Sequence, residues 1–189
     1  GAAVAPVQLA FHGEGPTQWS IAEVRGAYPD VAFRRALVTL RVQGFASPLV
    51  LDVVRAAGSK AHRYDLPLHF SGQLIDTGFP LRSNLAERPV LGTGFGYQHI
   101  WVDATGTPNA ENARVTWMTD GRFYSYRMLP PAGAQVILAE SGANDPRFNL
   151  RREPMLIQRI DKAREASFVS LLEPHGAYDP SAEIGRAHV

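Results

Sequence analysis

Side chains that transfer protons or hold metal ions gather in the segment HRYDLPLHF, residues 62–70. On an extended strand, residues of equal parity lie on one face, so His62 and Tyr64 point one way while Asp65 and His69 point the other. The two histidines therefore do not converge locally. The sequence also has no HxH, HExxH or cysteine pair, so spacing alone does not predict a zinc site here.

A second group lies in GYQHIWVD, residues 96–103. If this segment is a strand, Tyr97, His99, Trp101 and Asp103 share one face. Such a face is typical of a sugar-binding surface, because aromatic rings stack on pyranose rings and polar groups bind hydroxyls. A sandwich strand with a polar exterior and its apolar residues inward explains the pattern equally well, so both interpretations stay open.

A third group lies in RGAYPDV, residues 25–31. Tyr28 precedes Pro29, which favours an extended backbone at the tyrosine, and Arg25 is close in sequence. A neighbouring guanidinium stabilises a phenolate, which is the form in which tyrosine acts as a base. Tyr28 is therefore a candidate catalytic base and Arg25 a candidate partner for it.

The elements that position these groups read as β-strands. Apolar and polar residues alternate over 17–24, 31–41, 48–56, 61–70, 97–104 and 112–129, and Asp120-Gly121 within the last range is the signal of a type I′ hairpin turn. No segment sustains the 3.6-residue period of an amphipathic helix. About ten short strands with turn signals between them predict an all-β antiparallel β-sandwich. The longest segment without such alternation is 74–96.

Composition narrows the function classes. Apolar residues make up 45% of the 189 residues and charged residues 20%, with a net charge of +1, which favours a folded domain and disfavours nucleic-acid binding. The sequence has no cysteine and no apolar run of the roughly 20 residues that a membrane span needs. Because the chain begins GAAVAPVQLAF without Met, we expect it to be an internal piece of a longer protein.

The ordered motifs add a family resemblance. YDLP (64–67), GYQH (96–99), GANDPRFNLR (142–151) and EPHGAY (173–178) make residues 20–183 resemble the C-terminal part of heparinase II/III-like polysaccharide lyases, most like the oligoalginate lyases. The resemblance implies that residues 1–189 are the β-sandwich domain of a protein that also has an N-terminal α/α toroid. It implies a bacterial periplasmic or secreted location. The toroid and the last sandwich strands are expected to lie outside the chain.

The resemblance also implies a reaction, β-elimination on a uronate polysaccharide, with exo-type cleavage of oligoalginate as the expected specificity. It supports Tyr28 as the sandwich tyrosine of catalysis, with Arg25, Tyr97 and His99 as substrate-binding residues. No cofactor is needed for the elimination. Because the family's Asn-His pair and a further tyrosine come from the toroid, the chain alone is expected to be inactive.

Related lyases hold a structural zinc in the sandwich, and the resemblance makes His62 one candidate ligand, with His12 and Glu14 as weaker partners. The expected partners are an acidic polysaccharide and the protein's own toroid, with neither nucleic acid nor a membrane. Two alternatives stay open: a heparin-type glycosaminoglycan lyase, and a non-catalytic module that binds carbohydrate or supports the toroid.

Overall fold

The structure is a computed structural model that describes residues 4–142 and 152–177. Within these ranges all strand pairings are antiparallel, and the only helix is the single 3-10 turn η1 (Tyr97–His99). The predicted all-β antiparallel class is confirmed, with eleven strands where about ten were expected. No helix in the described ranges is long and apolar enough to cross a membrane.

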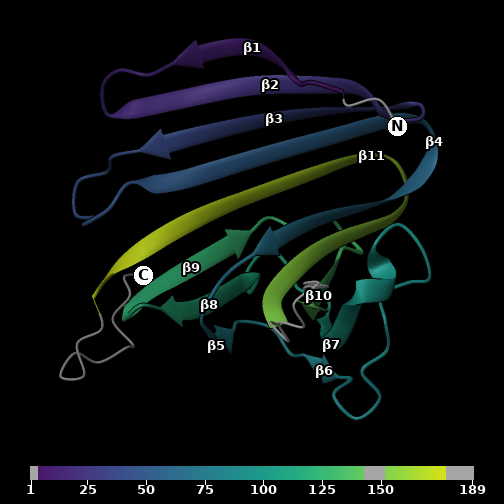
Figure 1. Ribbon diagram of the computed structural model, residues 1–189. Coiled ribbons are helices and arrows are strands. Elements are labelled where there is room, and N and C mark those ends of the chain that lie inside the picture. The colour runs from purple at the N-terminus through teal and green to yellow at the C-terminus, as the bar shows by residue number, and fades with distance from the viewer. Residues whose placement is uncertain (1–3, 143–151, 178–189) are drawn as a thin grey trace, which may run out of the picture.

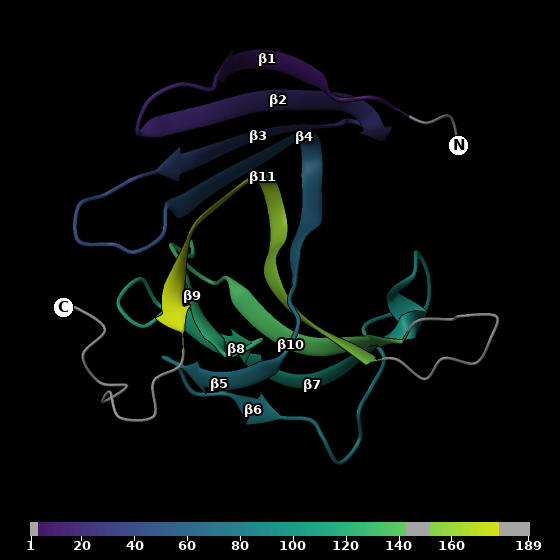
Figure 2. The same ribbon diagram turned by 60° about the vertical axis from the view of Figure 1, so that its left-hand side comes forward.

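The upper layer of Figures 1 and 2 contains β1 (Val7–His12), β2 (Thr17–Tyr28) and β3 (Val31–Leu40), followed by the first half of β4 (Leu49–His69) and the last third of β11 (Arg152–Ala177). These strands are neighbours in the order β1-β2-β3-β4-β11. Hairpin connections join successive strands, so the alternating sequence from residue 17 to residue 58 folds by local pairing.

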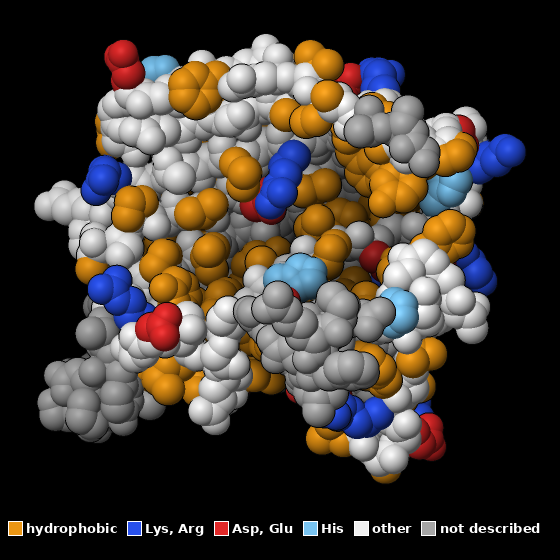
Figure 3. Space-filling model, viewed as in Figure 1, with side chains coloured by type: hydrophobic (Ala, Val, Ile, Leu, Met, Phe, Trp, Pro, Cys, Tyr) orange, Lys and Arg blue, Asp and Glu red, His pale blue; other side chains and the backbone are white. Residues whose placement is uncertain are grey.

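The lower layer contains six shorter strands and the first part of β11. They are β5 (Gln73–Thr77), β6 (Arg82–Ser83), β7 (Ile100–Gly106), β8 (Arg114–Thr119), β9 (Arg122–Met128) and β10 (Gln135–Gly142). In the face seen in Figure 3, apolar side chains line a hollow between the two layers. The two layers are parts of one continuous sheet that folds over itself, which makes a sandwich.

The long strands β4 and β11 connect the layers. The sequence predicts two separate strands over 48–56 and 61–70, but the structure has one strand that bends between them, where Gly58 leaves room for the His62 ring. β11 bends alongside, with register shifts between Ile160 and Glu165 and with Lys162 at a φ of 54°. The two strands pair on both sides of the bend, from Val50 to Ala57 and from His62 to His69, so they form a ribbon that connects the layers.

Three apolar clusters hold the sandwich together. One surrounds Val115, Val136 and Leu156 in the lower layer, and a second surrounds Ile137 and Ile157 on the opposite face of the same strands. The third fills the bend, where Tyr64 is buried among upper-layer side chains and its hydroxyl donates a hydrogen bond to the Arg164 carbonyl oxygen at 3.0 Å. The third cluster fixes the angle between the layers and so positions the end of β2 over the lower layer.

Two local predictions have clear outcomes. Asp120 and Gly121 have φ angles of 50° and 70°, as a type I′ turn requires, and they join β8 to β9 as predicted. The segment 74–96, expected to be irregular, contains most of β5 and all of β6. The motif residues 143–151 and Tyr178 lie outside the described residues.

Candidate active site

A pocket of about 400 Å³ lies where the end of β2 meets η1 and the lower halves of β4 and β11. Five lining residues carry groups that bind or transfer protons: Tyr28, Asp65, His69, Tyr97 and His99. They come from three separate segments of the chain, the end of β2, β4 and η1, so only the folded sandwich brings them together. We call this the tyrosine-histidine pocket.

A buried ion pair fixes one wall of the tyrosine-histidine pocket. Arg159 lies directly opposite Asp65 on the neighbouring strand and donates two hydrogen bonds to its carboxylate, at 2.8 and 2.7 Å. The Tyr97 hydroxyl donates to the same carboxylate at 2.5 Å. Only 7% of the Asp65 side chain and 13% of the Arg159 side chain are exposed. The carboxylate is therefore fully occupied by protein donors and orients Tyr97 rigidly.

The protonation of Tyr97 follows from this wall. Burial raises the pKa of Tyr97 to about 12, and the hydrogen bond to Asp65 acts in the same direction, while the Arg159 charge opposes it. Tyr97 is thus neutral at physiological pH and its proton points at Asp65. It is suited to position a ligand, and it is not suited to act as a base.

Tyr28 lies across the pocket in a contrasting environment. A bulge between Arg25 and Tyr28, with Gly26 at a φ of 78°, turns the end of β2 over the pocket. The ring packs edge-on against Phe33, with the ring centroids 5.5 Å apart, yet 61% of the residue is exposed. Its hydroxyl has no hydrogen bond to any described residue. Among the tyrosines of the pocket, Tyr28 is the one free to approach a ligand.

Two histidines complete the lining. His69 projects from β4 on the face that Asp65 occupies, as parity predicts, and His99 ends η1. Sequence reasoning did not select His69 as a site residue, although its shared parity with Asp65 was a usable signal. Both histidines are exposed, so their rings are accessible to a ligand in the pocket.

The expected strand over 97–104 is wrong at its start. Tyr97, Gln98 and His99 form the turn η1 after Gly96, whose φ is 90°, and β7 begins only at Ile100. Trp101 therefore does not extend an aromatic surface from Tyr97. It packs against Gly142 instead, where a β-carbon would come within 2.5 Å of the indole.

Comparisons with known proteins agree with this fold. No protein-family model matches the chain. It is 50% identical over 183 residues to an alginate lyase of Stenotrophomonas maltophilia and 42% identical over 181 residues to an exo-oligoalginate lyase of Saccharophagus degradans, covering 97% and 94% of the chain. The chain is a homologue of alginate lyases. It spans about a quarter of the length of either relative.

Solved structures with the same fold are heparinases. The alginate lyase homologue superposes on heparinase III, BT4657 gene product, with a TM-score of 0.58 at 13% identity, over 94% of the chain and 22% of that protein. Heparan sulfate lyase HepC of Pedobacter heparinus gives a TM-score of 0.53 at 12% identity, over 92% and 22%. These similarities show a shared fold, as the heparinase II/III-like resemblance predicts.

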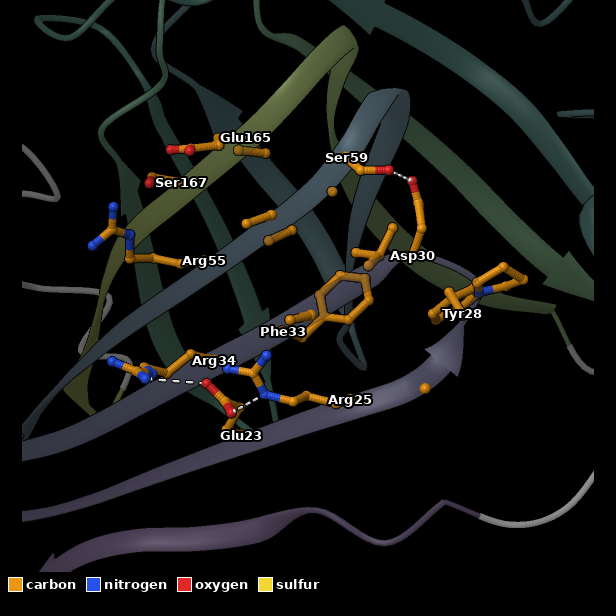
Figure 4. Close-up of a pocket in the computed structure, with 18 residues that line it drawn as sticks. Glu23, Arg25, Tyr28, Asp30, Phe33, Arg34, Arg55, Ser59, Glu165 and Ser167 are labelled. Atoms are coloured by element: carbon orange, nitrogen blue, oxygen red, sulfur yellow. Dashed lines mark hydrogen bonds and ion pairs between the residues drawn. The ribbon is translucent and has the colours of Figure 1, made fainter.

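Arg25 of this alginate lyase homologue lines a different, larger pocket of about 660 Å³ on the upper layer (Figure 4). Its guanidinium donates to Glu23 at 2.6 Å, and Arg34 contacts the same carboxylate at 3.1 Å. These two hydrogen bonds lower the pKa of Glu23. Tyr28 lines both pockets, so the two cavities meet at this residue. Arg25 itself does not line the tyrosine-histidine pocket.

The predicted zinc ligand His62 has one carboxylate partner. Its Nε2 lies 3.4 Å from Asp30, which also accepts a hydrogen bond from Ser59 at 2.7 Å. The Ser59 bond and then the His62 contact lower the pKa of Asp30. His12 pairs with Trp19, at the opposite end of β2 from Asp30, so it cannot join His62.

The fit of zinc to this region can be judged from the ligands available. In the described ranges no three histidine, aspartate or glutamate side chains lie close enough to hold a metal ion. Two ligands do not make a structural zinc site. The described residues therefore do not fit the zinc that the resemblance implies.

Proposed function

We propose that the chain is the β-sandwich part of an alginate lyase that cleaves uronate polysaccharide by β-elimination, with exo-type action on oligoalginate. The observation that carries this proposal is the convergence of Tyr28, Tyr97, His69 and His99 on one pocket of a chain 50% identical to an alginate lyase. An acidic oligosaccharide and the remaining domains of the longer protein are its proposed partners.

The chemistry assigns different tasks to these groups. A base removes the C5 proton of the uronate, the C4–O4 bond breaks as a C4=C5 double bond forms, and an acid protonates the departing O4. Tyr28, exposed and without a described hydrogen-bond partner, is the proposed proton-transfer residue. His99 and Tyr97 bind the substrate. A histidine beside the uronate carboxylate stabilises the negative charge that develops there in the transition state.

Replacing Tyr28 by Phe in the longer protein tests this assignment. We expect kcat to fall at least about 100-fold while KM changes little, because the hydroxyl acts in the transition state and the ring still contacts the substrate. The product is followed by the ultraviolet absorbance of its new double bond. Tyr124→Phe, on β9 and away from the pocket, is the matched control and should keep full turnover. A Tyr28→Phe protein with undiminished turnover would contradict the proposal.

The chain alone provides a second test. We propose that the 189-residue protein forms no unsaturated product, because the resemblance assigns part of the catalytic set to the toroid. Absorbance that rises when the chain is mixed with oligoalginate would exclude this. From the same resemblance we propose a periplasmic or secreted location, which fractionation of the producing cells tests.

Two alternatives make different predictions. A heparin-type lyase needs cations for sulfate groups, yet no lysine or arginine appears among the described residues that line the tyrosine-histidine pocket. Activity on heparan sulfate in place of alginate would favour that alternative. A non-catalytic carbohydrate-binding module is favoured if the longer protein binds oligoalginate and never turns it over.

A further inference from the structure

Phe95 combines two unfavourable features at the edge of the tyrosine-histidine pocket. Its side chain is fully exposed, at 106% of the reference area, and its φ is 59°. A large apolar side chain is ordinarily withdrawn from water, and a bulky residue in the left-handed region is an outlier. Strained and exposed positions of this kind concentrate at functional sites.

The local backbone holds Phe95 at the tip of a tight turn. The Tyr97 amide donates to the Gly94 carbonyl at 3.1 Å, and Gly96 follows Phe95 with a φ of 90°. Two successive positive φ angles make a type I′ turn, whose first central position is usually Asn, Asp or Gly. The turn is fixed further by the Gln98 side chain, which accepts a hydrogen bond from the Gly96 amide at 3.1 Å. Phe95 is therefore presented by a well-bonded turn.

The turn places Phe95 beside the proposed substrate groups. The next residue, Gly96, lines the pocket together with Tyr97 and His99. Neither Gly94 nor Gly96 has a neighbouring atom within 4 Å of an added β-carbon, so the space around the tip is open. An open, rigidly held aromatic ring next to a sugar-sized pocket suits the apolar face of a pyranose.

We propose that Phe95 forms a stacking subsite for the uronate residue adjacent to the one bound in the tyrosine-histidine pocket. The proposal rests on the proposed function and adds a specificity-determining residue to it. The ring contributes to binding and not to proton transfer, so it acts on oligosaccharides long enough to reach it. This accounts for an exposed phenylalanine at a position where Asn would fit the backbone better.

Phe95→Asn in the longer protein tests the subsite. We expect KM for an alginate trisaccharide to rise about three- to tenfold, with kcat within twofold, because one aromatic contact is lost. Phe95→Trp keeps an aromatic ring at this position and should have the KM of the original protein. The thermal unfolding midpoint of Phe95→Asn should be equal to or above that of the original protein, since Asn tolerates the left-handed conformation. Phe45 is another exposed phenylalanine, in the β3–β4 loop. Phe45→Asn is therefore the control and should leave KM unchanged.

The outcomes separate the two proposals. If the original protein turns over alginate and Phe95→Asn leaves KM unchanged, the subsite is wrong and the lyase function stands. If Phe95→Asn lowers the unfolding midpoint, the ring is packed against another part of the longer protein and the subsite is wrong. If the original protein shows no turnover of alginate, the proposed function itself fails, and the subsite fails with it.

Discussion

The buried pair of Asp65 and Arg159 supports a stability prediction that can be worked from the structure. Asp65→Asn keeps the shape of the side chain and removes its charge, which leaves the Arg159 guanidinium, with 13% of its side chain exposed, without a counter-ion. Removing one partner of a buried ion pair costs about 3 to 5 kcal/mol of unfolding free energy. We expect a loss in this range, measured by urea denaturation of the 189-residue protein.

The same two strands provide a matched control. Arg63 and Asp161 form an arginine-aspartate pair between β4 and β11 at 3.0 Å, but half of the Arg63 side chain and 47% of the Asp161 side chain are exposed. In Asp161→Asn, water solvates the guanidinium that loses its partner. The loss of unfolding free energy should therefore be close to the limit of detection.

A double substitution checks the physical cause. If the cost in Asp65→Asn comes from an unpaired buried charge, then adding Arg159→Met removes that charge and should recover much of the lost free energy. Equal destabilisation by Asp65→Asn and Asp161→Asn would refute the argument that burial makes the first pair critical. A double variant no more stable than Asp65→Asn would refute the assignment of the cost to the guanidinium.

Two further predictions concern the walls of the pocket. Because the pKa of Tyr97 is raised from 10 to about 12, the unfolded chain loses this proton first, and the free energy of unfolding should fall as pH rises from about 10 to 12. Tyr97→Phe should remove this part of the pH dependence. An identical slope of unfolding free energy against pH in both proteins would contradict the prediction. Gly142→Ala places a β-carbon 2.5 Å from Trp101 and should cost about 1 to 3 kcal/mol of unfolding free energy, measured by thermal unfolding. Gly176→Ala, with open space around it, should cost little. Equal losses of unfolding free energy in the two variants would exclude the clash.

Sequence patterns predicted the parts of the site that depend on regular strands. Parity placed Asp65 and His69 on one face of β4 and turned His62 to the other, because a side-chain period of two holds along any continuous strand. The hairpin turn at Asp120-Gly121 was also predicted, since the dipeptide encodes its own backbone geometry. Periodicity and turn chemistry were sufficient for these features.

The start of β7 was predicted wrongly, because periodicity alone does not report a turn. Alternation continues through Tyr97 and His99, but the positive φ of Gly96 begins a turn that takes them out of the strand. The Tyr97 and His99 amides donate the hydrogen bonds that close this turn to the Gly94 and Gly96 carbonyls, and no periodic pattern reports these bonds. The pairing of Asp65 with Arg159 was equally invisible, because the two residues are 94 positions apart and meet only through the β4–β11 register.

The two tyrosines of the pocket show how environment assigns roles to one residue type. Tyr97 is held by a buried carboxylate and keeps its proton, whereas Tyr28 is mostly exposed and its hydroxyl has no hydrogen bond to a described residue. Exchanging the roles would require Tyr97 to lose a proton beside an aspartate anion, which electrostatics opposes. In the proposed reaction, proton transfer by a tyrosine of this pocket is therefore assigned to Tyr28, because the Asp65–Arg159 pair holds Tyr97 in its protonated form.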